Sequence, residues 1–455
     1  MDMEKRMELI KQVGEEILTE EELRELLAKK RDPIAYDGFE PSGRMHIAQG
    51  ILRAININKM TRAGCKFKML VADWHAWANN KMGGDLDAIQ MVGEYMIEVW
   101  RASGMELDNV EFVWASDLAK DDEYWKIVMN VARASTLNRI IRTAQIMGRS
   151  ERDTLSAAQI LYPCMQAADI FYLKADITQL GMDQRKVNVL ARELGPSLGF
   201  WKPVVVSHHM LMGLVEPTTK PHIATRHLDL QGTLPLPNGG QLRIKSVPSQ
   251  KGLLPVLNHP AYGGRGFSAK FFYTPPKSVT ATEEELWQRE LTNLDGIGVK
   301  LISLDQMTGE AQLEIISGPS AEERAMAMKM SKSVPDSAIF MTDSVDDISE
   351  KISKAYCPEK QTNENPILEY CRHIIFGLNE EMKISRSAKW GGNVTYSSYG
   401  ELERDYAGGK LHPMDLKAAV IKYLVKAVEP IQKHFSKNKK AAELLKFVEG
   451  AKVTR

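Results

Sequence analysis

Strand-like and helix-like patterns of hydrophobic positions alternate along the first 210 residues of the chain. Short apolar runs typical of buried strands lie at 34–39, 67–73, 110–115, 176–180 and 203–207. Helical spacing follows them from about Ile47, over 86–99, over 124–134 and after Gln184. Strands that alternate with helices predict an α/β fold, a parallel sheet with helices on both faces. Residues 4–30 are rich in Glu, Leu and Lys and predict one or two surface helices.

The pattern changes after residue 214. Residues 215–325 carry many Pro and Gly residues and predict an inserted module made mostly of strands and loops. Within it, 299–304 and 311–316 predict a hairpin, and Thr282 with Glu285 predicts a capping box for a short helix. From about 345 the spacing is helical again. We therefore expect a catalytic domain with N-terminal helices at 1–214, the insert at 215–325, a return to the catalytic domain at 326–345 and a mostly helical domain at 346–455.

Composition narrows the class of protein. The 455 residues are 44% hydrophobic and 26% charged with a formal net charge of zero, which is ordinary for a globular protein of two or three domains. Contacts with nucleic acid then have to come from local basic patches. The four cysteines show no CxxC spacing, which argues against a structural zinc site and for a reducing compartment. No apolar stretch reaches the length of a membrane span, and we expect a cytoplasmic protein.

One helix face between 157 and 173 is predicted to carry polar groups into a buried environment. Tyr162, Gln166 and Asp169 stand at i, i+4 and i+7, which places a phenol, an amide and a carboxylate on one side of a helix. Apolar neighbours on both sides indicate that this helix is buried, and buried polar groups need partners. The pattern favours the wall of a ligand pocket that holds an ammonium group and a hydroxyl. The alternative is a solvated polar stripe.

A second polar segment, residues 181–186, follows a predicted strand and opens a helix. Its Gly181 allows close approach of the backbone, and Asp183 is placed to accept from ribose hydroxyls, as carboxylates do at strand ends of nucleotide-binding folds. An ordinary strand-to-helix turn explains the same pattern equally well.

Two further segments together predict an ATP site. Residues 329–333, with Lys329 and Lys332, form a loop whose two cations can reach a triphosphate. Residues 39–49 place His46 after a glycine-containing turn at the expected start of a helix, where phosphates bind. Either segment alone is equally consistent with an ordinary solvated loop or helix start. Both in one chain, in this order, predict the formation of an adenylate.

With these motifs the chain resembles the class I tyrosyl-tRNA synthetases of the archaeal and eukaryotic cytosolic type, in a plant- and protozoan-like form. The resemblance covers residues 30–213 and 326–430. It rests on Tyr36–Gly43, His46–Gln49, Tyr162–Gln166 with Asp169, Gly181–Lys186, Lys329–Ser333 and Leu411–Lys417. It implies a Rossmann-like catalytic domain, a helical anticodon-binding domain and a homodimer. It also implies MgATP as substrate, no tightly bound cofactor and no metal site of the protein's own.

The resemblance also implies roles for single residues. Tyr36 and Asp169 would bind the phenolic hydroxyl of tyrosine, and Tyr162, Gln166 and Gln184 its amino group. The adenosine side would be lined by Gly38, Glu40, Gly181 and Asp183. The phosphates would meet Ser42, His46, Gln49, Lys329 and Lys332. The acceptor stem of the tRNA would meet Arg142, Arg185 and Lys186, and the anticodon would meet Trp390, His412 and Asp415.

Two features depart from the family pattern. Ala48 and Gln49 stand where the family usually has Gly and His, and Gln49 carries no charge. The insert at 215–325 has no role that the sequence explains. Two rival functions therefore stay open: a tryptophanyl-tRNA synthetase, which the Tyr36–Asp169 pair disfavours, and a non-catalytic tRNA-binding protein, which the intact lysines disfavour.

Overall fold

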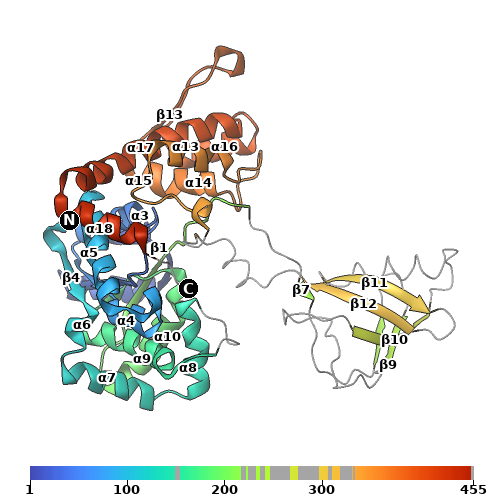
Figure 1. Ribbon diagram of the computed structural model, residues 1–455, viewed down its shortest axis with the longest axis horizontal. Coiled ribbons are helices and arrows are strands. Elements are labelled where there is room, and N and C mark those ends of the chain that lie inside the picture. Colours follow the sequence, from blue (N-terminus) through green and yellow to red (C-terminus); the bar gives the residue numbers. More distant parts are fainter. Residues whose placement is uncertain are drawn as a thin grey trace. The chain divides into compact units, whose positions relative to one another are not determined.

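The computed structural model describes residues 1–148, 154–216, 222–223, 232–235, 241–245, 267–274, 297–305, 310–317, 330 and 334–451. These residues divide into two compact units, Met1–Val215 with Met330–Arg455, and Glu216–Lys329. Figure 1 labels the elements of both units.

A six-stranded sheet organises the first unit, in the order β1-β6-β5-β2-β3-β4. Five of its strands run parallel, and β1 pairs antiparallel with β6 at the edge. The strands are β1 (Gly14–Leu18), β2 (Ile34–Phe39), β3 (Lys66–Val71), β4 (Val110–Trp114), β5 (Ile177–Thr178) and β6 (Val204–His208). The expected parallel α/β sheet is confirmed for the five runs that the hydrophobic pattern indicated.

Helices connect these strands and cover the sheet with two separate hydrophobic cores. One core includes buried side chains of α1, α2, α3 and α5, and the other includes those of α7, α8, α9 and α10. The α-helices of this region are α1 (Met3–Lys11), α2 (Glu20–Lys29), α3 (Ile51–Arg62), α4 (Asp73–Ala78), α5 (Leu86–Ala102), α6 (Ala115–Leu118), α7 (Asp122–Arg133), α8 (Leu137–Thr143), α9 (Ala157–Tyr172) and α10 (Arg185–Leu194). Short 3-10 turns are η1 (Lys81–Gly84), η2 (Leu107–Asn109), η3 (Ala144–Met147), η4 (Met182–Gln184) and η5 (Pro196–Leu198).

The strand order reverses between β2 and β5. Chain connections lead from β2 to β3 and β4 on one side, and from β5 to β6 on the other. Ligands of open parallel sheets bind beyond the carboxyl ends of the strands at such a switch point. Tyr36 on β2 and Gly181 after β5 both lie at this point, because the main-chain N–H of Gln179 donates to the carbonyl of Tyr36 at 2.8 Å.

Two sequence-based expectations about this region were wrong. Residues 4–30 hold a strand between two helices, since β1 joins the sheet edge. Its sequence, Gly-Glu-Glu-Ile-Leu, lacks the alternation that marks a strand. The helix expected from about Ile47 begins only at Ile51. The preceding residues form turns, and Ile47 donates its main-chain N–H to the carbonyl of Ile339 at 2.8 Å.

The C-terminal region is mostly helical, as expected, and shares the larger hydrophobic core with α1, α3 and α5. Its elements are η6 (Pro335–Ser337), α13 (Val345–Lys354), α14 (Pro366–Tyr370), the π-helix η7 (Cys371–Ile375), α15 (Phe376–Leu378), β13 (Met382–Ile384), η8 (Ala388–Trp390), β14 (Val394–Tyr396), α16 (Tyr399–Ala407), α17 (Pro413–Lys437) and α18 (Lys439–Gly450). Figure 1 shows the β13–β14 hairpin projecting away from these helices.

The second unit contains an antiparallel sheet in the order β11-β12-β10-β9-β8, with β7 paired to β12. Its strands are β7 (His222–Ile223), β8 (Gly232–Pro235), β9 (Gln241–Lys245), β10 (Phe267–Thr274), β11 (Ile297–Asp305) and β12 (Glu310–Ser317). The hairpin predicted at 299–304 and 311–316 is confirmed as β11 and β12. The helix expected near Thr282 lies outside the described residues.

Candidate active site

A buried carboxylate, Asp169, forms the centre of the site. It lies on α9, has no exposed surface, and stands on the same helix face as Tyr162 and Gln166, which are 6% and 7% exposed. The hydroxyl of Tyr124 donates to Asp169 Oδ1 at 2.9 Å. Tyr36, 1% exposed on β2, lies close enough to Asp169 that the charge of this carboxylate adds to burial in raising the pKa of the Tyr36 phenol. The structure thus brings Tyr36 and Asp169 together, from the first central strand and a mid-chain helix.

His75 completes the surroundings of Asp169. Its Nε2 atom lies 2.9 Å from Asp169 Oδ2, an ion-pair distance whose direction is not that of a hydrogen bond. Burial lowers the pKa of His75, but the Asp169 carboxylate together with the charges of Glu40 and Asp73 outweighs it, and the pKa is raised overall. Sequence reasoning missed both His75 and Tyr124. For His75 a signal existed, because it follows directly after the end of β3, whereas Tyr124 stands in an ordinary helical pattern.

Burial keeps the phenols of this pocket protonated. The pKa of Tyr36 is raised well above its ordinary value, first by burial and then by the charge of Asp169. The pKa of Tyr162 is raised in the same way, first by burial and then by Glu40. At neutral pH these hydroxyls are hydrogen-bond donors and the carboxylates are acceptors. Such a pocket can bind a hydroxyl group that donates to Asp169 and accepts from Tyr36.

A chain of amides continues from Asp169 along the pocket wall. Gln166 Nε2 donates to Gln184 Oε1, and Gln184 Nε2 donates to the carbonyl of Ile146, both at 3.1 Å. The Gln166 Oε1 atom is buried and has no hydrogen-bond partner among the described residues. An unpaired buried acceptor is costly, and an ammonium group bound here would pair with it.

Two glycines near strand ends, Gly38 and Gly181, leave little room for a side chain. A Cβ atom at Gly181 would lie 2.5 Å from Asp183 Oδ1 and 2.6 Å from the sulfur of Met210. A Cβ atom at Gly38 would lie 3.3 Å from the hydroxyl oxygen of Tyr36. Bare backbone at these two strand ends allows a flat ligand to approach closely.

Glu40 and Ser42 follow β2 in the same region. Glu40 accepts a hydrogen bond from Asn79 Nδ2 at 3.0 Å and lies 3.7 Å from Lys81 Nζ. The hydroxyl of Ser42 donates to the carbonyl of Glu40 at 3.3 Å. The carboxylate of Glu40 is therefore held on the side that faces Tyr162.

A buried polar network that the sequence did not reveal lies under the switch point. Arg53 Nη2 on α3 lies 2.9 Å from Asp37 Oδ2 on β2 and donates a hydrogen bond to Gln179. Gln179 Nε2 lies 3.2 Å from His208 Nδ1. Burial raises the pKa of Asp37 to about 7, although the charge of Arg53 opposes the change. These residues fix β2, β5 and β6 relative to α3.

His46 lies in a turn before α3, where its backbone forms an antiparallel bridge with Phe340. The expectation that it stands at the start of a helix was therefore wrong. Gln49 shares this turn, and its main-chain carbonyl accepts from Trp100 Nε1 at 2.8 Å. The Gln49 Oε1 atom is buried and has no hydrogen-bond partner in the described part of the chain. Lys329 and Lys332 lie outside the described residues.

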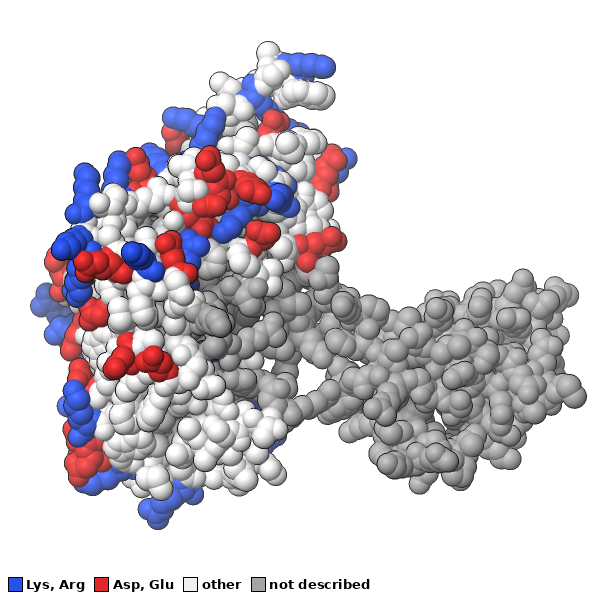
Figure 2. Space-filling view, viewed as in Figure 1, with Lys and Arg blue, Asp and Glu red and all other residues white. Residues whose placement is uncertain are grey.

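The residues expected to contact the tRNA acceptor stem are exposed, and two of them already pair with side chains of this chain. Arg185 Nε pairs with both carboxylate oxygens of Glu16 at 2.9 Å. The ammonium group of Lys186 donates to the side chain of Gln145. Arg142, on α8, is exposed, and its Nε atom donates to the carbonyl of Asn138 at 3.4 Å. Over the described residues, basic and acidic side chains are interspersed on the face shown in Figure 2.

The three residues expected at the anticodon are brought near one another by Arg386. Arg386 Nε donates to the carbonyl of Gly392 at 2.7 Å, and its Nη1 atom donates to the carbonyl of Lys410 at 2.6 Å. It thereby ties the β13–β14 hairpin to the start of α17, where His412 caps the helix and Asp415 lies in the first turn. Trp390, at the hairpin tip, is 65% exposed. An exposed indole of this kind is a stacking surface for an unpaired base.

Three comparisons with known proteins agree with this geometry. The family of tRNA synthetases class I (W and Y) matches residues 28–221 and 311–429. Tyrosine--tRNA ligase 1, cytoplasmic, of Arabidopsis thaliana is 42% identical over 457 positions, which take in 100% of this chain and 90% of that protein. Tyrosine--tRNA ligase of Thermococcus sibiricus is 34% identical, with 99% of each chain covered.

Solved structures give the same result. Tyrosyl-tRNA synthetase of Pyrococcus horikoshii in complex with L-tyrosine is 33% identical, with a TM-score of 0.71 over 98% of this chain and 100% of that one. The Leishmania major enzyme in complex with tyrosinol is 35% identical with a TM-score of 0.70; the match covers 99% of this chain and 61% of that one.

Proposed function

Since this chain belongs to the class I tRNA synthetases for tryptophan and tyrosine and is a tyrosine--tRNA ligase, we propose that its Tyr36–Asp169 pocket binds the substrate tyrosine by the phenolic hydroxyl. The observation that carries this proposal is the buried Asp169 carboxylate, whose charge acts on the equally buried Tyr36 phenol. Phenylalanine would leave these buried groups unpaired, and such sites reject it by roughly 10⁴–10⁵, a ratio taken from tyrosyl-tRNA synthetases as a class.

The amino group of tyrosine is assigned to Tyr162, Gln166 and Gln184. The buried and unpaired Gln166 Oε1 atom supports this assignment, because an ammonium donor would satisfy it. An indole would offer no hydroxyl to Tyr36 and Asp169, which is why we assign tyrosine rather than tryptophan.

The nucleotide of this ATP-dependent reaction is assigned to the glycine-lined strand ends. ATP, bound with Mg²⁺, would place its adenosine against Gly38, Glu40, Gly181 and Asp183, and its phosphates by Ser42, His46, Gln49, Lys329 and Lys332. The tyrosine carboxylate attacks the α-phosphate, a new oxygen–phosphorus bond forms, and the bond to pyrophosphate breaks. Charge develops on the phosphoryl oxygens, so positioning and cations supply the catalysis without a protein nucleophile. The 3′-terminal ribose hydroxyl of tRNA(Tyr) then attacks the tyrosyl-adenylate and releases AMP.

The tRNA is assigned two contact regions on this chain. Arg142, Arg185 and Lys186 would meet the acceptor stem, and Arg185 would exchange Glu16 for a phosphate. Trp390, His412 and Asp415 would meet the anticodon, with Trp390 as the stacking surface.

We also propose a homodimer, which buries the exposed apolar side chains Met129 and Leu137 of the α7–α8 region. A cytoplasmic location is proposed by analogy with the Arabidopsis relatives; none of the described helices is long and apolar enough to cross a membrane.

Tyrosine-dependent exchange of pyrophosphate into ATP tests the activation step. We expect exchange with tyrosine and little with phenylalanine or tryptophan. Exchange that prefers tryptophan would reassign the pocket, and tRNA binding without any exchange would indicate a non-catalytic protein.

Asp169→Ala should abolish adenylate formation or greatly weaken the preference for tyrosine over phenylalanine. An unchanged preference would remove Asp169 from the pocket.

The anticodon assignment is tested by Trp390→Ala. Loss of a stacked base costs roughly 1–3 kcal/mol. This energy corresponds to a fall of about one to two orders of magnitude in kcat/KM for tRNA charging. Pyrophosphate exchange should not change, because Trp390 lies on a hairpin outside the catalytic region. Equal losses in both assays would contradict the assignment.

A further inference from the structure

A carboxylate outside the assigned site, Asp343, joins the His46 segment to the C-terminal helices. It is 2% exposed. Its Oδ1 atom accepts from Arg44 Nη2 at 2.8 Å, and its Oδ2 atom accepts from Lys351 Nζ of α13 at 2.6 Å. Its main-chain carbonyl also accepts from the side-chain amide of Gln432 on α17. Asp343 thus contacts Arg44 and Lys351 through its carboxylate and Gln432 through its main-chain carbonyl.

The same carboxylate shapes the strand that pairs with His46. Asp343 Oδ2 accepts from the main-chain N–H of Phe340 at 2.9 Å, which closes a turn over 340–343. Phe340 forms the antiparallel bridge with His46, and the main-chain N–H of Met341 donates to the carbonyl of Met45 at 2.9 Å. The backbone around His46 is therefore held by the 339–341 segment, which leads into the turn that Asp343 closes.

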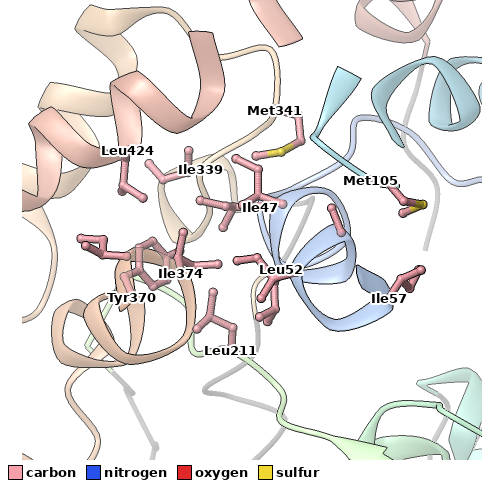
Figure 3. Close-up of a cluster of buried hydrophobic side chains, with 14 of the residues drawn as sticks. Ile47, Leu52, Ile57, Met105, Leu211, Ile339, Met341, Tyr370, Ile374 and Leu424 are labelled. Carbon is pink, nitrogen blue, oxygen red and sulfur yellow. The ribbon is translucent and has the colours of Figure 1, made fainter. Parts of the chain in front are cut away.

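Cations and apolar packing fix this arrangement from both sides. The guanidinium of Arg44 lies 4.5 Å from the centre of the Phe340 ring, and the ammonium of Lys351 lies 4.8 Å from it. Figure 3 shows Ile47, Ile339 and Met341 side by side in a cluster that also contains Leu424 of α17. A carboxylate buried between two cations is costly to disrupt, because removal of its charge leaves both cations uncompensated.

Helix α17 gives the C-terminal region a direct connection to this point. Its first turn carries Asp415, assigned above to the anticodon, and its later part carries Gln432, on the Asp343 carbonyl. The 17 residues between them span about 25 Å of helix. A shift of this helix would therefore move Gln432 and change its hydrogen bond to the Asp343 carbonyl.

We propose that Asp343 is a positioning residue that holds the His46 segment in place for the phosphates of ATP and links its placement to helix α17. This inference rests on the proposed function, since it concerns the phosphate side of the same site. Asp343 touches neither tyrosine nor the Tyr36–Asp169 pocket. Its loss should therefore affect the use of ATP and leave the binding of tyrosine unchanged.

The test is Asp343→Asn, an isosteric change that removes the charge. In tyrosine-dependent pyrophosphate exchange we expect kcat/KM for ATP to fall by roughly 10–100-fold, as small misplacements of a catalytic segment do. KM for tyrosine should change less than about twofold. Gln432→Met, which removes only the contact from α17, should change kcat/KM for ATP in the same direction by a smaller factor. The matched control is Glu350→Gln, which breaks an exposed pair with Lys354 one residue from Lys351.

The outcomes separate the two proposals. Wild-type exchange with unchanged ATP kinetics in Asp343→Asn would overturn the inference and leave the proposed function intact. Parallel losses for ATP and tyrosine would show a general structural role and would also overturn it. Absence of tyrosine-dependent exchange in the wild type would remove both. The concentration of competent sites is measured for each variant by active-site titration, so that partial misfolding is not read as a change in ATP use.

Discussion

Asp169 has no exposed surface, and two phenols and an imidazole surround it. Tyr124 donates to one oxygen, His75 lies against the other, and Tyr36 adds a third contact. A carboxylate fixed in this way cannot rotate to suit a different ligand. At the residue scale, we therefore assign selectivity to the neighbours of Asp169 as well as to Asp169 itself.

His75→Gln tests this assignment. The amide keeps a donor but cannot take up the proton that the neighbouring carboxylates, by raising the pKa of His75, favour. We expect kcat/KM for tyrosine to fall by roughly 10–100-fold, with a smaller preference for tyrosine over phenylalanine. Pyrophosphate exchange with both amino acids measures the change. Trp77→Phe, at an exposed position on the same helix, is the control. A His75 variant with wild-type preference would place the residue outside the selectivity of the pocket.

At the scale of elements, the close approach of α3 to the strand at 339–341 depends on one small residue. A Cβ atom at Gly50, the N-cap of α3, would lie 2.4 Å from the sulfur of Met341 and 2.6 Å from its Cγ atom. Met341 is fully buried. The start of α3 therefore sits where it does because residue 50 has no side chain.

Gly50→Ala should destabilise the protein by about 1–3 kcal/mol through overpacking. The double variant Gly50→Ala with Met341→Ala should lose less than the sum of the two single changes, because the smaller side chain makes room for the new methyl group. Urea unfolding of the four proteins measures this coupling. Gly400→Ala, where no atom lies within 4 Å of the new Cβ, should be neutral or slightly stabilising. Strict additivity of the first two changes would contradict the contact.

At the scale of the whole first unit, a charged histidine connects its N-terminal, central and C-terminal parts. His209 Nδ1 lies 3.0 Å from Glu15 on β1, and His209 Nε2 lies 3.1 Å from Glu369 on α14. Burial lowers the pKa of His209, but hydrogen bonds to both glutamates outweigh it and raise the pKa to about 9. The ring of His373 stacks on it at 4.4 Å. Burial, the charge of His209 and the charge of Arg372 lower the pKa of His373 to about 3.

These pKa values predict a pH dependence of stability. The raised pKa of His209 stabilises the fold fully below about pH 6.5, and this contribution is lost as pH rises towards 9. Its size is on the order of 1–3 kcal/mol. The lowered pKa of His373 has the opposite effect on stability. As pH falls below 6.5, the unfolded chain takes up a proton on His373 that the folded protein does not, so the fold loses stability.

His209→Gln should therefore unfold at lower urea concentration than the wild type at pH 6.5, and the difference should shrink at pH 9. Urea midpoints of both proteins at several pH values measure it. His434→Gln, which removes a different histidine–glutamate contact at 2.7 Å, with the buried Glu98, controls for the loss of such a contact. A difference that is the same at pH 6.5 and 9 would rule out protonation of His209 as its source.

The sequence predicted the parts of this fold that local patterns encode. The five parallel strands and the i, i+4, i+7 face of α9 follow from periodicity alone. The strand β1 and the delayed start of α3 could not be predicted, because pairing with β6 and with Ile339 decides both. The contacts of Asp169 with His75 and Tyr124 depend on tertiary placement in the same way. Polar residues near strand ends can be named as candidates from the sequence. Which of them contact Asp169 is decided by tertiary packing.

The antiparallel edge strand β1 has a practical consequence for shortened forms of the protein. A chain that began at residue 30 would keep every residue assigned to tyrosine and ATP. It would also leave β6, whose five residues are all buried, with an open row of main-chain donors and acceptors. Open apolar strand edges recruit further chains. Such a truncation should therefore precipitate or form sheet-rich aggregates, which makes the first 18 residues a solubility element as well as part of the fold.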